Sequence, residues 1–178
     1  ERIWEFDTYR YRLGYPNREV RVSLPRAVLN RYVPDLMAKE RTRDRIARAR
    51  KQDDPAALEG AFQAFFASIP HDWYRRNDLA SYEGYWASLV YCLFAALGVD
   101  TRAEEASSHG QVDLVIEYQG RAWLLEFKMD EGGDSQRALD QIKVKGYHHR
   151  YTGRPVTLIG MDFSQEQRNL AGFAWERL

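Results

Sequence analysis

Residues 110–128, GQVDLVIEYQGRAWLLEFK, hold two apolar runs separated only by Gln119 and Gly120. Residues 112–118 and 121–128 are rich in the β-branched, aromatic and leucine side chains that favour strands. A two-residue connection between such runs predicts a tight antiparallel hairpin. That hairpin restricts the chain to folds that contain a sheet.

The predicted hairpin brings two acids together. With Tyr118 opposite Arg121, counting outward along both strands places Asp113 opposite Glu126. Directly opposed residues have Cβ atoms about 4.5–5.5 Å apart, and like charges at that distance oppose folding unless something neutralises them. Lys128, two residues beyond Glu126, projects from the same face. One face of the hairpin is therefore expected to carry two carboxylates and one ammonium group.

The surroundings of these acids favour a metal site. Val115 and Leu124 share their face, so the face is at least partly buried, and a buried carboxylate without a partner is costly. A divalent cation would neutralise the pair, and hard oxygen ligands suit Mg²⁺ or Mn²⁺ better than zinc. The alternative is an exposed sheet face on which Asp113 and Glu126 are ordinary polar residues and Lys128 is their salt-bridge partner.

Two predicted helices offer further members of this site. Residues 81–97 form an apolar helical pattern with Glu83 in its first turn, where the carboxylate either reaches the metal or only favours the positive end of the helix. In the predicted helix over residues 135–151, the apolar residues around Gln141 face the sheet, so Gln141 is expected above the hairpin acids. Tyr147 is interpreted as a helix-packing residue.

The order of predicted elements in the second half is α, β, β, β, α, β and α, with a strand over residues 156–163 and a last helix that ends near Leu178. This order predicts an α/β fold with a mixed sheet and helices on both faces. Residues 1–77 are predicted to be a mostly helical extension or linker from an upstream domain. Residues 78–178 are predicted to form the α/β domain itself.

Composition narrows the class of protein. The chain has 26 basic and 26 acidic residues, and its longest apolar run, residues 87–99, is too short to span a bilayer. Cys92 is the single cysteine, so an intrachain disulfide is excluded, which suits a reducing compartment. No basic-then-apolar leader opens the chain. We therefore expect a soluble cytoplasmic protein that does not contact the membrane.

A basic run stands out in the first half. Residues 39–51 carry seven Lys or Arg against two acids, with few large apolar residues. The pattern indicates a solvated helix or loop, and the functional alternative is contact with a nucleic-acid backbone.

The chain resembles the PD-(D/E)xK nuclease superfamily. GQVD at 110–113, EFK at 126–128, the helix glutamate Glu83 and QIKVKGY at 141–147 follow the order that the superfamily uses. More narrowly, the second half resembles the nuclease-like domain found C-terminal to AAA-ATPase-like domains in bacteria and archaea. Val112 stands where the superfamily has its proline, and Gln111 where an arginine is common.

The resemblance implies a restriction-endonuclease-like αβββαβ core and a Mg²⁺-dependent (or Mn²⁺-dependent) deoxyribonuclease. It implies that Asp113 and Glu126 bind the metal, that Glu83 assists, that Lys128 orients or activates the attacking water and that Gln141 steadies the site. It also implies DNA as a partner and an upstream AAA-ATPase-like domain of the same full-length protein. The chain contains no GxxxxGK[ST] phosphate-binding loop of its own.

Two alternatives stay open at this point. The first is a non-catalytic module that docks nucleic acid or a partner for an associated ATPase, which the zero net charge and Gln111 favour. The second is an assembly domain whose helical front part mediates oligomer contacts.

Overall fold

The computed structural model describes residues 2–5, 8–11, 15–33, 35–70, 83–107, 110–129 and 134–178. The helices are α1 (Arg18–Tyr32), α2 (Leu36–Gln52), α3 (Ala56–Ala67), α5 (Glu83–Ala96), α6 (Ser135–Val144) and the 3-10 helix η2 (Tyr147–Tyr151). The strands are β1 (Arg2–Glu5), β2 (Thr8–Tyr11), β3 (Asp100–Ser107), β4 (Gly110–Tyr118), β5 (Arg121–Lys128), β6 (Val156–Ser164) and β7 (Asn169–Arg177). None of the helices in these ranges is long and apolar enough to cross a membrane.

The central sheet has five strands in the order β3-β4-β5-β6-β7. β5 and β6 run parallel, and every other neighbouring pair is antiparallel. Parallel neighbours need a crossover connection, and α6 with η2 supplies it. The mixed sheet and the αβββαβ order from α5 to β6 confirm the predicted fold class. β1 and β2 form a separate two-stranded sheet.

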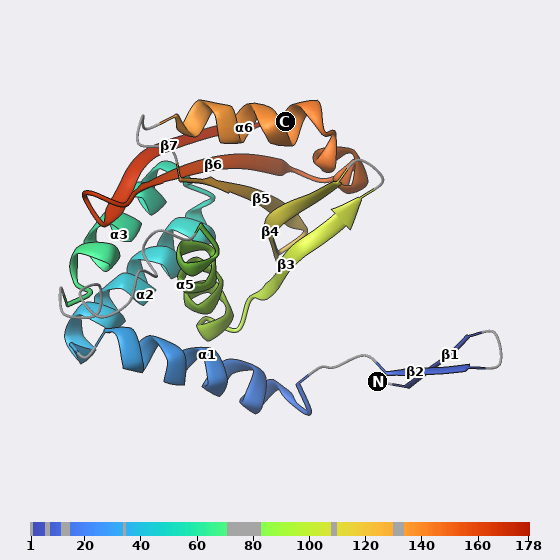
Figure 1. Cartoon of the computed structure of the whole chain (residues 1–178), viewed down its shortest axis with the longest axis horizontal. Coiled ribbons are helices and arrows are strands. Elements are labelled where there is room, and N and C mark those ends of the chain that lie inside the picture. Colours follow the sequence, from blue (N-terminus) through green and yellow to red (C-terminus); the bar gives the residue numbers. More distant parts are fainter. Residues whose placement is uncertain are drawn as a thin grey trace.

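Helices cover both faces of the sheet, as predicted. Figure 1 shows α6 over one face and α2, α3 and α5 on the other side. On the α6 side, Leu139 and Ile142 pack with Val115, Leu124 and Leu158. Neighbouring strand residues point to opposite faces, and the opposite face carries a larger core. Asp113 and Glu126 are two residues from Val115 and Leu124 on the same strands. The two acids therefore share the face that α6 covers.

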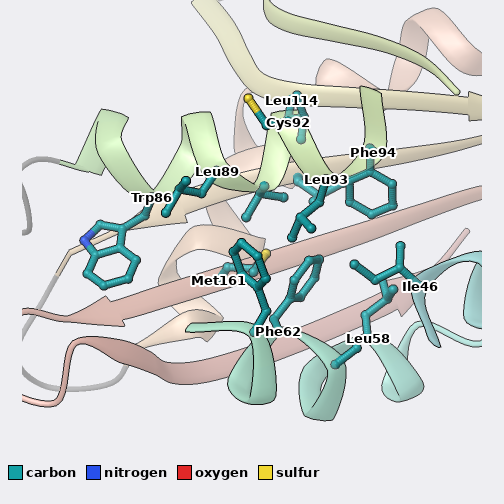
Figure 2. Close-up of a cluster of buried hydrophobic side chains, with 14 of the residues drawn as sticks. Ile46, Leu58, Phe62, Trp86, Leu89, Cys92, Leu93, Phe94, Leu114 and Met161 are labelled. Atoms are coloured by element: carbon teal, nitrogen blue, oxygen red, sulfur yellow. The ribbon is translucent and has the colours of Figure 1, made fainter. Parts of the chain in front are cut away.

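The larger core joins helices α1, α2, α3 and α5 to the sheet. Figure 2 shows Phe62 of α3, Phe94 of α5 and Met161 of β6 in one buried cluster. The rings of Phe62 and Phe94 meet edge to face with centroids 6.1 Å apart, a favourable aromatic arrangement. The predicted boundary between residues 77 and 78 lies outside the described residues, and the two-part division stays a prediction.

The predicted hairpin is confirmed, and so is its register as far as Leu114–Leu125, while the predicted pair of Asp113 and Glu126 lies beyond the ladder. β4 and β5 pair from Tyr118–Arg121 at the turn to Leu114–Leu125. Gln119 and Gly120 both have positive φ, 49° and 77°, as a two-residue hairpin turn of type I′ requires. Glycine meets this requirement without steric cost.

The predicted last helix is wrong, because the chain after β6 turns back as strand β7. Arg168, at φ 53°, belongs to the turn, and β7 then pairs with β6 from Ser164–Asn169 to Thr157–Arg177. Hydrogen bonding along β6 outweighs the helix-favouring Gln, Glu and Ala of this segment. The predicted helix over 135–151 also ends early, since Gly146 at φ 63° separates α6 from η2.

The basic run of residues 39–51 lies in helix α2. The helix is solvated along only part of its surface, because Ile46 and Ala49 are buried against the core. Its exposed residues include Arg41, Arg45 and Arg48 as well as the acids Glu40 and Asp44.

Candidate active site

Asp113 on β4 and Glu126 on β5 lie at the end of the paired part of the hairpin. The regular ladder stops at Leu114–Leu125, one position before these two acids. Asp113 reaches β5 through its side chain instead, because its Oδ2 accepts a hydrogen bond of 2.8 Å from the backbone N–H of Phe127. The two carboxylates are close enough for the charge of Asp113 to raise the pKa of Glu126.

Glu126 is almost completely enclosed, with a relative exposure of 1%. Its Oε1 accepts hydrogen bonds from Nε2 of Gln141 on α6 and, at 3.3 Å, from Nζ of Lys128. Its Oε2 is buried and accepts no hydrogen bond from the part of the chain that the structure describes. Burial first, and then the charge of Asp113, raises the pKa of Glu126 from 4.5 to about 7, although Lys128 opposes the shift.

A glycine on β6 sets how closely α6 approaches this site. Gly160 is the neighbour of Glu126 in the parallel β5–β6 ladder. A Cβ at Gly160 would lie 2.2 Å from the backbone oxygen of Ser135 and 2.7 Å from the backbone nitrogen of Leu139. Only glycine permits this contact between strand and helix. The close approach brings Gln141 within reach of Glu126.

Tyr147 also belongs to the environment of the site. It is the first residue of η2 and is buried in the core on the α6 side, which confirms its predicted packing role. Burial and the charges of Glu126 and Asp113 raise the pKa of its hydroxyl, while a hydrogen bond with Gln141 opposes the shift. The sequence interpretation missed this proximity to the two acids. Its position six residues after Gln141 was the available signal.

Glu83 lies in the first turn of α5, on the opposite side of the sheet from α6. Trp86, one turn later, stacks on Phe163 of β6 with ring centroids 5.2 Å apart. Phe163 directly follows Asp162, which neighbours Lys128 in the ladder. The start of α5 is therefore at the same end of the sheet as Lys128. The role of Glu83 in metal binding stays a prediction.

Asp162 is a further acid that the sequence analysis did not single out. It is fully buried and is the ladder neighbour of Lys128 on β6. The signal was the same as for Asp113, an acid inside an apolar strand. Within the described ranges, no group of three or more His, Cys, Asp and Glu side chains is arranged to hold a metal ion.

The five-stranded mixed sheet, the flanking helices and the acids at the end of the hairpin define a restriction-endonuclease-like α/β core. The chain belongs to the PD-(D/E)XK nuclease superfamily, whose family model matches residues 81–173. The matched segment contains Glu83, Asp113, Glu126, Lys128 and Gln141.

Among curated proteins, the chain is similar to an uncharacterized protein from the vnfD 5′ region of Azotobacter chroococcum mcd 1, with 46% identity over 171 residues. The similarity covers 95% of this chain and 33% of that protein. The chain thus spans about a third of the length of this relative. No solved structure matches the chain.

Proposed function

We propose that this domain is a Mg²⁺- or Mn²⁺-dependent nuclease that hydrolyses phosphodiester bonds in DNA. The observation that carries the proposal is the corner formed by Asp113, Glu126 and Lys128, in a chain of the PD-(D/E)XK superfamily. Gln141 of α6 donates a hydrogen bond to Glu126 and so connects these residues to the helix.

The residues of this corner suit a hard divalent cation. Oε2 of Glu126 is buried and receives no hydrogen bond from the described residues. The charge of Asp113 is close enough to raise the pKa of Glu126. A cation between the two acids would remove the repulsion that raises the pKa of Glu126. Asp113 and Glu126 would hold the ion. Glu83 starts α5 on the other face of the sheet, so its part as an assisting carboxylate stays a prediction. When bound, the ion supplies a positive centre for the scissile phosphate and lowers the pKa of the attacking water.

The remaining residues act through position and charge. Lys128 is held with its Nζ 3.3 Å from Oε1 of Glu126, so its ammonium group stands beside the acids and can orient the attacking water. It also adds positive charge where negative charge develops on the phosphate. Gln141 donates to the same Oε1 and fixes the conformation of Glu126.

Plasmid DNA incubated with the protein and Mg²⁺ or Mn²⁺ tests this proposal. The parent protein is expected to nick or linearise the plasmid. Asp113→Asn and Lys128→Ala are each expected to lower the rate by about 100-fold or more, as expected for the loss of an electrostatic catalytic group. EDTA should abolish cleavage.

Matched controls separate catalysis from surface charge. Asp140→Asn removes an exposed carboxylate next to Gln141, and Arg18→Ala removes an exposed guanidinium group at the start of α1. Both are expected to cleave at the parent rate. Equal cleavage by all variants would remove the assignment. Salt-dependent DNA binding without metal-dependent cleavage would instead select the non-catalytic docking module. An upstream ATPase-like domain as partner stays a prediction.

A further inference from the structure

Helix α2 presents a row of three arginines to solvent. Arg41, Arg45 and Arg48 are all exposed, while Thr42, Ile46 and Ala49 between them are buried. Spacings of four and three residues place the arginines on one face of a helix. This row is called the arginine stripe.

The arginine stripe is not used for ion pairs within the described part of the chain. Arg43, on the neighbouring face, makes a salt bridge of 2.7 Å to Glu40, but no comparable bond engages Arg41, Arg45 or Arg48 there. The described residues thus leave these three guanidinium groups unpaired at the surface of α2, with the exposed acids Glu40 and Asp44 nearby.

A groove runs beside the stripe. It has a volume of about 360 Å³ and lies between Arg41 and Arg45 of α2 and the end of α3. Ala64, Ala67 and Ser68 form the α3 wall, so this side is small and uncharged. Asp35 lines one end, where its carboxylate already accepts hydrogen bonds from the first backbone N–H groups of α2. A polyanionic chain can thus approach the arginines without meeting bulky side chains.

The length of the stripe matches a nucleic-acid backbone. Seven residues of α-helix separate Arg41 from Arg48, which is about 10.5 Å at a rise of 1.5 Å per residue. One strand of duplex DNA has a phosphate about every 3.4 Å along the axis, so the stripe spans about three phosphates. Arginine is also the side chain whose planar guanidinium group pairs best with phosphate oxygens.

The groove lies near the end of the sheet that carries the catalytic corner. Lys128 neighbours Asp162 on β6, and the β6–β7 turn follows within two residues, where Ser164 pairs with Asn169. Nδ2 of Asn169 donates a hydrogen bond of 3.2 Å to the backbone oxygen of Gln63 on α3. Gln63 directly precedes Ala64 in the wall of the groove. The groove and the corner of Asp113, Glu126 and Lys128 therefore lie at the same end of the sheet, on opposite faces of it (Figure 1).

We infer that the arginine stripe with the α2–α3 groove binds the phosphodiester backbone of the DNA substrate. The inference rests on the proposed function for its choice of DNA as the partner. Substrate binding is thereby assigned to helices α2 and α3, which lie outside residues 81–173 that match the family model.

DNA binding measured without metal tests the inference separately from catalysis. Labelled duplex and single-stranded oligonucleotides are titrated with the 178-residue chain in EDTA over a series of KCl concentrations. Arg41→Ala/Arg45→Ala/Arg48→Ala is expected to weaken binding at least tenfold at low salt. Each lost phosphate contact lowers the slope of log K against log[salt] by about 0.9, so the triple variant should lose about 2 to 3 units of slope.

Three controls make the result specific. Replacing the same residues by lysine keeps the charge and should keep most of the salt slope. Arg18→Ala/Arg26→Ala removes two exposed cations of α1 and should leave the slope unchanged. Asp44→Asn removes the exposed acid beside the stripe and should tighten binding. Single alanine variants, each expected to lose about 1 unit of slope, decide the case if the triple variant fails to fold.

The outcomes separate this inference from the proposed catalysis. Parental affinity and salt slope in the folded alanine variants would overturn the inference, even where metal-dependent cleavage is found. An equal loss in the Arg18→Ala/Arg26→Ala control would also overturn it. If the stripe variants lose binding of acidic polypeptides but not of DNA, the partner is a protein and the inference fails. Stripe-dependent DNA binding without cleavage supports the inference while removing the catalytic proposal.

Discussion

The carboxylate of Asp113 accepts a hydrogen bond of 2.8 Å from the backbone N–H of Phe127, at the point where β4 and β5 stop pairing. A side-chain hydrogen bond here takes the place of a backbone hydrogen bond between the two strands. It fixes the Asp113 carboxylate beside Glu126, so the two acids are held together by the fold before any cation binds.

Asp113→Asn and Asp113→Ala are expected to differ in stability while sharing a catalytic defect. Asparagine can still accept from the N–H of Phe127 and removes the charge that opposes ionisation of Glu126, so the metal-free protein should be at least as stable as the parent. Alanine leaves that N–H without its acceptor, which costs about 1–3 kcal/mol. Urea unfolding in EDTA measures the difference. Equal stability of the two variants would show that this hydrogen bond contributes nothing.

The pKa of Glu126 predicts how the stability of the metal-free protein depends on pH. Because the folded-state pKa is raised from 4.5 to about 7, the folded state binds the proton more tightly than the unfolded state. The stability from this group is complete below about pH 4.5 and is lost as pH rises through about 7. Glu126→Gln should flatten this part of the profile, and Asp140→Asn should not. Chemical unfolding in EDTA at several pH values between 4 and 8 measures it.

The hairpin was predictable because its determinants are local. Gln119 and Gly120 set the turn, the turn sets the register, and the register brings the segments that carry Asp113 and Glu126 to the same end of the hairpin. A two-residue turn leaves little freedom for another pairing. Local sequence also explains why the helix predicted over residues 81–97 agrees with α5, which is described from Glu83 to Ala96.

The parts that were not predictable depend on contacts between distant segments. β7 becomes a strand because β6 offers it a free edge, which residues 169–177 do not reveal. The close approach of α6 to Gly160 depends on the packing of a helix against a sheet. The end of the ladder before Asp113 was also missed, since a regular hairpin would continue to Glu126.

Cys92 is expected to be unreactive in the folded protein. It lies in α5 with a relative exposure of 8%, and burial raises the pKa of its thiol from 9.0 to about 11. Only the thiolate attacks disulfide reagents, and two pKa units lower its fraction about 100-fold. Ellman's reagent at pH 8 should therefore label the native protein at least 100-fold more slowly than the urea-unfolded protein. Rapid labelling without denaturant would mean that α5 opens readily from the core.

Gly160→Ala is expected to damage both the fold and the site. The added Cβ would lie 2.2 Å from the backbone oxygen of Ser135, and a backbone atom cannot move aside as the end of a flexible side chain can. Helix α6 must shift away from β6, at a cost of about 1–3 kcal/mol or more for an overpacked contact. The shift would withdraw Gln141 from Glu126, so metal-dependent cleavage should fall even in the fraction that stays folded.

Gly60→Ala provides the matched control for this glycine. Gly60 lies in α3, and a Cβ there meets no atom within 4 Å. Alanine should therefore raise the stability by about 0.5–1 kcal/mol through helix propensity alone, with cleavage unchanged. Urea unfolding and plasmid cleavage measured on both variants separate the two effects. If Gly160→Ala matched the parent in both measurements, the close contact between α6 and β6 would not be what positions Gln141.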